Sequence, residues 1–146
     1  MKRFAILALM MFSASEAHAV TGTATFNGLI APTCILTAGT AGTLISNADY
    51  TNLSSANAGG LESTVGAVAT SALFGITTDA PTGISADTLA SSYSLTGATT
   101  AATQSGTTKT TLLAGASTVH VNMSATRTNS YFGAGNYIGT VTVRCE

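Results

Sequence analysis

The sequence predicts an all-β protein with an antiparallel β-sandwich fold. Several short stretches alternate between apolar and polar residues with a period of two, which is typical of half-buried strands. The connections between these stretches are polar and marked by glycine, and no stretch carries a convincing helical period. Charged residues make up 8% of the chain, against about 25% in an ordinary soluble domain. Together these features favour one sandwich built from short strands.

The first residues have the features of a secretory signal peptide. Lys2 and Arg3 precede an apolar run over residues 4–12, and small residues end at Ala17-His18-Ala19. A charged start, a short apolar run and an A-x-A site predict cleavage after Ala19, with an uncleaved N-terminal anchor as the alternative. No later stretch is long enough to cross a bilayer. We therefore assign residues 1–19 to a signal peptide and expect a secreted or cell-surface protein without a membrane span after cleavage.

Residues 20–31 form a long alternating stretch, which predicts the first strand. One face of this strand carries Val20, Gly22, Ala24, Phe26, Gly28 and Ile30. The other face is threonine-rich and polar as far as Asn27. Extended at about 3.3 Å per residue, the stretch would reach roughly 40 Å. A strand of this kind at the start of the mature chain can complete its own sheet or add to a neighbour's sheet. The sequence leaves both arrangements open.

Residues 32–146 supply the rest of the sandwich domain. Pro32 ends or bends the first strand because proline has no amide proton to donate. Residues 62–78 fit either a helix or a strand, and the interleaved Thr, Ser and Gly favour the strand. Alternation predicts further strands at 43–45, 89–95, 118–125 and 137–145, a short one at Leu112-Leu113, and loops at 47–60 and 97–109.

Cys34 and Cys145 are the two cysteines of the chain. In an oxidising compartment a single pair most simply forms a disulfide. A metal-binding pair or a catalytic thiol are the alternatives, and each would need further ligands or a base. A disulfide here would tie the first strand region to the last and stabilise the fold by about 4–5 kcal/mol in chain-entropy models.

The chemistry-bearing residues are few. After residue 19 the chain has three basic and five acidic side chains, so no basic patch for nucleic acid is expected. His120 is the one histidine of the mature part, on the polar face of its strand, where a solvated surface imidazole is the simplest interpretation. No metal-ligand spacing, nucleotide-binding motif or nucleophile motif is present, so neither a cofactor nor a metal is expected. The sequence therefore predicts a protein that is not an enzyme, with an exported hydrolase kept as a minor alternative.

Two regions resemble chaperone–usher pilins, in particular the archaic type with spore-coat-U-like domains. The first is Val20-Thr21-Gly22, the alternating strand and Cys34 shortly after Pro32. The second is residues 133–143, which look like the glycine–tyrosine–alternating final strand of such subunits. In many pilins the first cysteine pairs with one in the following strand, whereas here the second cysteine is near the C-terminus.

The resemblance implies an immunoglobulin-like sandwich that lacks one strand and is completed by donor-strand exchange. Residues 20–31 would be the donor strand, with Phe26 and Ile30 as its larger side chains. Tyr137, Val141 and Val143 would lie on the last strand, beside the acceptor groove. The implied partners are identical or related subunits, a periplasmic chaperone and an outer-membrane usher, and the implied role is adhesion or biofilm formation.

A second hypothesis stays open beside the pilus subunit. The chain could be a self-complete, secreted immunoglobulin-like module that binds a partner and does not polymerise. The two hypotheses differ in one structural respect, which is whether residues 20–31 pair within their own domain.

Overall fold

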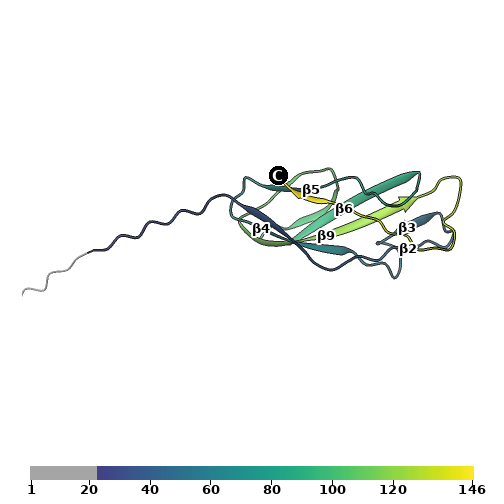
Figure 1. The fold of residues 1–146 in the computed structure, drawn as a ribbon, viewed down its shortest axis with the longest axis horizontal. Coiled ribbons are helices and arrows are strands. Elements are labelled where there is room, and N and C mark those ends of the chain that lie inside the picture. Colours follow the sequence, from purple (N-terminus) through teal and green to yellow (C-terminus); the bar gives the residue numbers. More distant parts are fainter. Residues whose placement is uncertain (1–22) are drawn as a thin grey trace, which may run out of the picture.

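The computed structural model describes residues 23–146. The predicted signal peptide, together with Val20 and Gly22, lies outside the described residues. From Thr23 to Thr33 the backbone is extended, belongs to no strand and points away from the folded body (Figure 1). The described part of the predicted first strand is therefore unpaired in this single chain, where no neighbouring strand supplies hydrogen-bond partners.

Residues 23–146 contain ten strands and no helix. The strands are β1 (Cys34–Ala38), β2 (Ile45–Ser46), β3 (Asn52–Ser54), β4 (Ser63–Ala69), β5 (Gly75–Thr78), β6 (Thr88–Gly97), β7 (Ala101–Ser105), β8 (Thr110–Thr111), β9 (Gly115–Thr126) and β10 (Val143–Cys145). All pairings between them are antiparallel. The strand interpretation of residues 62–78 is confirmed, since β4 and β5 occupy this stretch.

β9 organises the larger sheet. One of its edges pairs with β6, and the other pairs first with β4 and then with β3. β1, β2 and β7 extend the sheet beyond β4, β3 and β6, which makes seven strands. Val119, Val121, Met123 and Ala125 are buried, while the residues between them are half-buried. The alternation that predicted this strand therefore reports its inner and outer faces.

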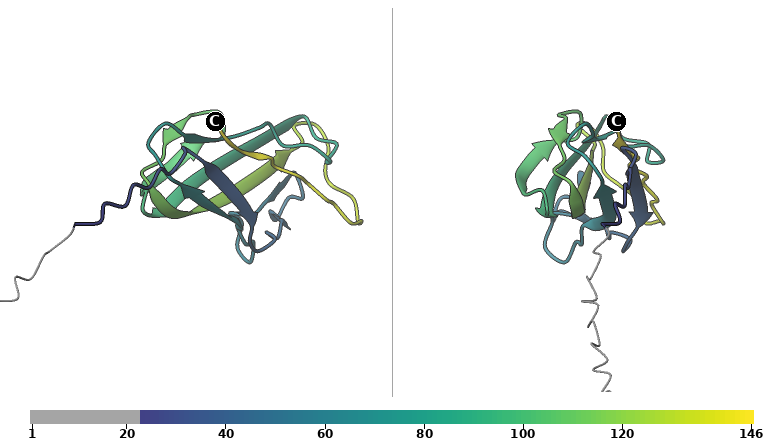
Figure 2. Two further views of the ribbon diagram at one scale, coloured as in Figure 1. Left: turned by 60° about the vertical axis from the view of Figure 1, so that its left-hand side comes forward. Right: turned by 90° about the vertical axis from the view of Figure 1, so that its left-hand side faces the viewer.

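A smaller sheet in the order β10-β5-β8 covers part of the larger one. All four residues of β5 are buried, so this strand is covered on both faces. The larger sheet curls, and the two sheets enclose a common core (Figure 2). The predicted all-β, antiparallel architecture is confirmed, and the curled arrangement is consistent with a β-sandwich.

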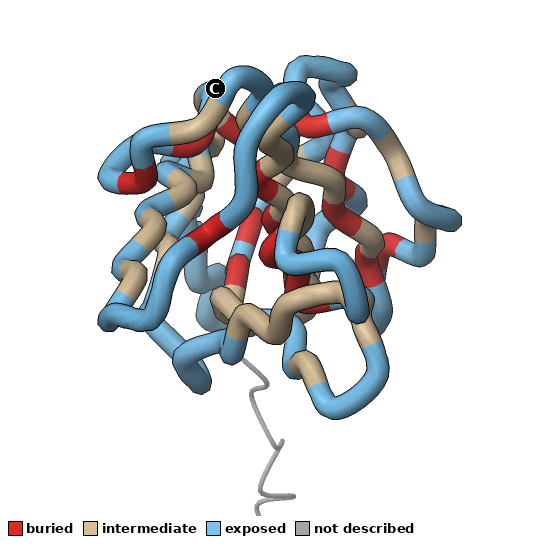
Figure 3. The backbone as a smooth tube through the Cα atoms, turned by 90° about the vertical axis from the view of Figure 1, so that its right-hand side faces the viewer, coloured by how far each residue is buried: buried red, intermediate tan, exposed pale blue. Residues whose placement is uncertain are grey.

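The core is a narrow apolar interior surrounded by exposed loops (Figure 3). Tyr93, Ile76, Leu95, Leu112 and Val119 are its largest fully buried side chains. Leu53, Ile84, Met123, Ala125 and Phe132 form a second cluster. Within the described residues, every buried side-chain nitrogen or oxygen has a hydrogen-bond partner. The many Ser and Thr residues therefore leave no buried side-chain polar atom of this small core without a hydrogen bond.

Four predictions on individual elements are wrong. The short strand expected at Leu112-Leu113 lies two residues earlier, as β8. The expected loop at 47–60 contains β3, and the expected loop at 97–109 contains β7. The expected strand at 137–145 is regular only over β10, with a single bridge at Thr140 before it. Each difference comes from pairing with a distant strand, or from its absence, which local composition does not encode.

The predicted disulfide between Cys34 and Cys145 is confirmed. It joins the start of β1 to the end of β10, across 6.4 Å between Cα atoms and 111 residues of sequence. The metal-pair and reactive-thiol alternatives are wrong, since no described cysteine is free. The bond connects the larger sheet to the smaller one at a single end of the molecule.

Candidate functional site

β1 and the residues that follow it are hydrogen-bonded along one edge only. β1 pairs with β4. Beyond β1, the amide of Gly39 donates to the carbonyl oxygen of Thr64, and Thr43 forms a bridge with Leu61. Among residues 23–146, no strand pairs with the opposite edge of β1. This edge leaves its backbone donors and acceptors available to another strand.

The last segment of the chain has the same property. β10 pairs with β5. Before β10, the amide of Asp79 donates to the carbonyl oxygen of Thr142, and Thr82 forms a bridge with Thr140. In the described part of the chain, the opposite edge of β10 has no partner strand. The β1 and β10 edges lie side by side, as the dark-blue and yellow strands in Figure 2 show, and are joined there by the disulfide.

A groove of about 440 Å³ lies between the two half-paired edges. Residues 41–44, which follow β1, line one side of this groove, and residues 137–141 and Val143 line the other. Val65 of β4 and Val121 and Met123 of β9 also line it. The three residues predicted to lie beside a groove, Tyr137, Val141 and Val143, all line it. We call this space the edge groove.

The apolar side chains of the edge groove are half-buried rather than buried. Leu44, Val65, Val141 and Val143 pack against the two core clusters but remain partly exposed. In a closed sandwich, side chains that contact the core are covered by a neighbouring strand as well. The edge groove is therefore a strip of core surface that no neighbouring strand of the described chain covers.

Gly139 allows the last segment to lie directly on the interior. A Cβ atom at this position would fall 2.5 Å from Sδ of Met123 and 3.2 Å from Cδ1 of Ile84. On the same segment, the Tyr137 ring packs edge-on against Phe132, with ring centroids 5.3 Å apart. The Tyr137 hydroxyl donates to the carbonyl oxygen of Gly133 at 2.8 Å. These contacts position the segment even though it forms little regular strand.

A second hollow of about 840 Å³ continues from the edge groove. The two share Gly42, Thr43, Leu44 and Tyr137. The second hollow lies toward β2, β3 and the loop before residue 137, at the end of the molecule opposite the extension (Figure 1). The edge groove therefore continues into a second hollow at this end, while the disulfide joins β1 to β10 at the other end of the molecule.

The extension carries apolar side chains without a partner in the described chain. Phe26, Leu29 and Ile30 are 93%, 97% and 81% exposed. On the predicted inward face, Ala24 and Gly28 are exposed as well. The structure therefore does not bring the predicted first-strand residues and the last-strand residues together within one chain.

Thr70 fixes the base of the extension. The Thr70 amide donates to the carbonyl oxygen of Thr33 at 3.0 Å. The Thr70 hydroxyl accepts from the Thr33 amide at 2.7 Å and donates to the carbonyl oxygen of Ala31 at 3.1 Å. Pro32 adds a restricted φ at the same place. These contacts hold the exit of the chain in an extended course away from the body.

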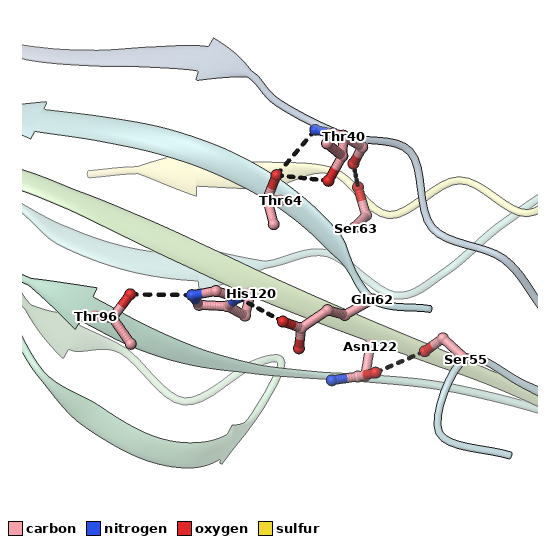
Figure 4. A network of polar contacts seen from close by, with 8 residues as sticks. All are labelled: Thr40, Ser55, Glu62, Ser63, Thr64, Thr96, His120 and Asn122. Carbon is pink, nitrogen blue, oxygen red and sulfur yellow. Dashed lines mark hydrogen bonds and ion pairs between the residues drawn. The ribbon is translucent and has the colours of Figure 1, made fainter. Parts of the chain in front are cut away.

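His120 has partners that the sequence did not predict. Its Nδ1 lies 2.6 Å from Oε1 of Glu62, and its Nε2 lies 3.0 Å from Oγ1 of Thr96 (Figure 4). Because a carboxylate only accepts hydrogen bonds, Nδ1 carries the proton toward Glu62. The order hydroxyl–imidazole–carboxylate is that of a nucleophile with its base. Neither Thr96 nor His120 lines either hollow, however.

The remaining ion pair lies at the outer side of the last strand. Nε and Nη2 of Arg144 donate to the two carboxylate oxygens of Asp79, at 2.5 and 2.7 Å. This hydrogen-bonded guanidinium holds the pKa of the Asp79 carboxyl below its usual range, and the carboxylate in turn raises the pKa of Arg144. The pair adds a side-chain link between β10 and the residue after β5.

Nothing in the described residues suggests a metal centre. No group of three or more His, Cys, Asp and Glu side chains in residues 23–146 is placed to hold a metal ion. In the same residues, no helix is long and apolar enough to cross a membrane. No family model, curated protein or solved structure matches the chain.

Proposed function

We propose that this protein is an exported structural subunit that polymerises by strand addition, as pilus subunits do. The N-terminal extension of one copy would fill the edge groove of the next copy and complete its sandwich. The observation that supports this proposal is the groove between residues 41–44, which follow β1, and the segment that leads into β10, two stretches paired on one edge only and lying over half-buried core side chains. Such edges are ready-made templates for an added strand.

The extension is long enough to fill the edge groove, and its chemistry suits the groove. The groove segment of residues 137–143 would span about 23 Å at 3.3 Å per residue, against roughly 40 Å for residues 20–31. The extension alternates, so Phe26 and Ile30 point to one face together, toward apolar groove residues such as Val65 and Val141. Full burial of each large side chain would contribute about 1.5–3 kcal/mol.

The base of the extension supports pairing between copies rather than within one. Thr70 and Pro32 direct the chain outward at the disulfide end of the molecule, away from the edge groove. To enter its own groove the chain would have to reverse within Ala31–Thr33 and give up these contacts. An extension that leaves one end of each copy and enters the next makes a head-to-tail interface that does not close, which produces filaments.

The same proposal covers fold family, location and role. We propose an incomplete immunoglobulin-like sandwich, delivered to the cell surface through the bacterial periplasm, with a role in adhesion or biofilm formation. A periplasmic chaperone and an outer-membrane usher would protect and order the subunits before assembly. A catalytic role for Thr96, His120 and Glu62 is not proposed, because the cluster borders neither of the two hollows.

The experiment compares Phe26→Asp with Thr25→Asp. The two variants carry the same new charge on adjacent residues, but only residue 26 points into the groove in the proposed pairing. Phe26→Asp should weaken assembly of the purified protein by about tenfold to a hundredfold or more, from the loss of side-chain burial alone. Thr25→Asp should assemble with a strength close to that of the wild type. Sedimentation and electron microscopy report the polymer, and circular dichroism reports the fold.

The opposite result supports the self-complete binding module. If the wild-type protein stays a monomer at high concentration and Phe26→Asp unfolds it, the extension belongs to its own sandwich. Adding a synthetic peptide of residues 20–31 to a chain that lacks them separates the two cases further. A strand that is donated between copies should bind this truncated chain and raise its unfolding temperature.

A further inference from the structure

Asn27 and Gly28 form the only Asn-Gly pair in the sequence, and this pair lies in the exposed extension. Every residue from Thr23 to Thr33 is exposed. Within residues 23–146, no backbone hydrogen bond joins Asn27 or Gly28 to another residue. No heavy atom lies within 4 Å of where a Cβ of Gly28 would be. The pair is therefore free of the contacts that normally fix a backbone in one conformation.

We propose that Asn27-Gly28 is a deamidation site whose conversion ends the ability of an unassembled subunit to donate its strand. The inference rests on the proposed function only for this consequence. The reaction itself needs no partner, no cofactor and no enzyme, because the backbone nitrogen of Gly28 is the nucleophile and water is the co-reactant.

The chemistry proceeds in two balanced steps. The Gly28 amide loses its proton to hydroxide, and its nitrogen attacks Cγ of Asn27. The N–Cγ bond forms, the Cγ–Nδ2 bond breaks, and Nδ2 leaves as ammonia with a proton from water. Water then opens the resulting five-membered succinimide at either carbonyl. Opening at the backbone carbonyl gives an isoaspartyl linkage, and opening at the side-chain carbonyl gives aspartate.

Glycine at position 28 makes this ring closure accessible. Its nitrogen is not shielded by a side chain, and glycine allows a wide range of backbone conformations. Asn129 is also exposed in a loop, but serine follows it. Asn52 and Asn122 lie in strands, and their side chains are hydrogen-bonded to Thr126 and Ser55. Among these asparagines, the chain thus offers one that combines exposure with a following glycine.

Strand pairing would protect the site. A residue in an antiparallel strand is held at ψ near +135°, and the ring closure requires Asn27 to leave this conformation. In an occupied edge groove, the ladder of backbone hydrogen bonds opposes that change. A subunit that has donated its strand should keep Asn27, while a subunit that waits in solution should lose it.

The product would not fit as a donor strand. An isoaspartyl linkage adds a methylene group to the backbone between Phe26 and Ile30. Because side chains alternate strictly along a strand, this extra length moves Ile30 off the register set by Phe26. The new carboxylate adds a charge to a stretch that has none between residues 23 and 33. Subunits that have remained unassembled would therefore lose the ability to donate their strand.

The test follows the purified protein during incubation as free subunit and as assembled polymer. Peptide mapping by mass spectrometry should find that the side-chain amide of residue 27 becomes a carboxyl group in the free subunit. The rate of this deamidation should rise with pH, and it should be much lower in the polymer. Labelling by an isoaspartyl methyltransferase should find the isomer. Asn27→Gln should lack the modification, Gly28→Ala should slow it many-fold, and Asn129 serves as the internal control.

Assembly of each aged sample is compared with that of the same sample before ageing. Wild type should lose assembly in proportion to its isoaspartyl content, while aged Asn27→Gln should keep its own starting value. The inference is overturned if residue 27 keeps its amide while Asn129 converts, if polymer and free subunit convert equally, or if isoaspartyl chains assemble like fresh ones. Fresh wild-type protein that never assembles would count against the proposed function, whereas the peptide map still decides the deamidation itself.

Discussion

The hydroxyl oxygen of Tyr93 lies 2.9 Å from the carbonyl oxygen of Ile76 and connects the two sheets through the core. Tyr93 belongs to β6 of the larger sheet, Ile76 belongs to β5 of the smaller one, and both are fully buried. The same hydroxyl lies 2.6 Å from the carbonyl oxygen of Thr108 and 2.7 Å from Oγ1 of Thr110. One phenol therefore joins β6, β5 and the turn before β8.

Tyr93→Phe should lower the free energy of unfolding by about 1–3 kcal/mol, because it removes the hydroxyl proton that one of these carbonyl oxygens accepts. The ring itself stays in place, so the loss reports the hydroxyl alone. Tyr131→Phe, at an exposed position, is the matched control and should be nearly neutral. Chemical denaturation measures both. A neutral Tyr93→Phe variant would mean that the sheets are held together without this link.

Replacing both Cys34 and Cys145 by serine should lower the free energy of unfolding by up to about 4–5 kcal/mol, as expected for a disulfide that closes a loop of over a hundred residues. The reduced wild-type protein should lose a similar amount. Denaturation with and without a reductant measures the effect. If reduction leaves the stability unchanged, the unfolded chain gains no entropy from opening this loop.

Gly139→Ala should destabilise the protein by about 1 kcal/mol, at the low end of overpacking costs, because the new methyl group would displace the end of the flexible Met123 side chain. The closest atom would be Sδ or Cε of Met123. Gly133→Ala is the matched control, because no heavy atom lies within 4 Å of a Cβ there. Thermal unfolding measures both variants. Equal behaviour of the two would show that the Met123 side chain yields without cost.

The Asp79–Arg144 pair should make a small contribution to stability that depends on pH. The Asp79 pKa is lowered from its ordinary value of 3.8 in the native state, so the unfolded chain takes up the proton first as pH falls. The stabilisation is complete well above pH 3.8 and disappears as the pH falls through the native pKa. Arg144→Gln should therefore lose less stability on acidification than the wild type.

Salt and a second variant control the measurement on this pair. Both side chains are well exposed, at 56% and 39%, so the effect should shrink at high ionic strength. Lys109→Gln removes the same charge from another place and should keep the wild-type acid profile. Identical profiles for all three proteins would contradict the assigned role of the pair.

His120→Ala should leave assembly unchanged, since the imidazole borders neither hollow. A small loss of stability is expected from the broken contacts with Glu62 and Thr96, on the scale of an exposed pair, about 0.2–1 kcal/mol. Assembly assays and denaturation measure the two effects. A hydrolytic activity that the wild type has and the variant loses, with an unchanged circular dichroism spectrum, would refute this prediction and point to catalysis.

The sequence predicted those strands whose apolar–polar alternation follows directly from burial of one face of the sheet. β6 and β9 are long, and their alternation encodes burial on the inner face, so both were found with small errors at their ends. β3 and β7 were missed because these strands are short and show no clear apolar alternation, as in Asn52-Leu53-Ser54. Each is a strand because it pairs with a distant or neighbouring strand. Such tertiary pairing has no local signature.

The site was predictable in part. The cysteine pair and the apolar face of Tyr137, Val141 and Val143 could be read from the chain, because each depends on residue type or on period. The partners of His120 could not. Glu62 and Thr96 lie 58 and 24 residues away, and they meet only through the register of three strands. Whether the extension pairs in its own chain was equally hidden, since an alternating strand has the same sequence in either arrangement.

The disulfide also has a mechanical consequence for a filament of such subunits. Tension would enter each subunit through the extension, which is continuous with β1 at Cys34. It would leave through the edges that grip the next extension, and one of these edges ends at Cys145. The covalent bond between the two cysteines joins the loaded strands at the point where force arrives. Much of the load would bypass the hydrogen-bonded body, so a stretched fibre should yield first at the inserted strand, and each subunit should remain folded.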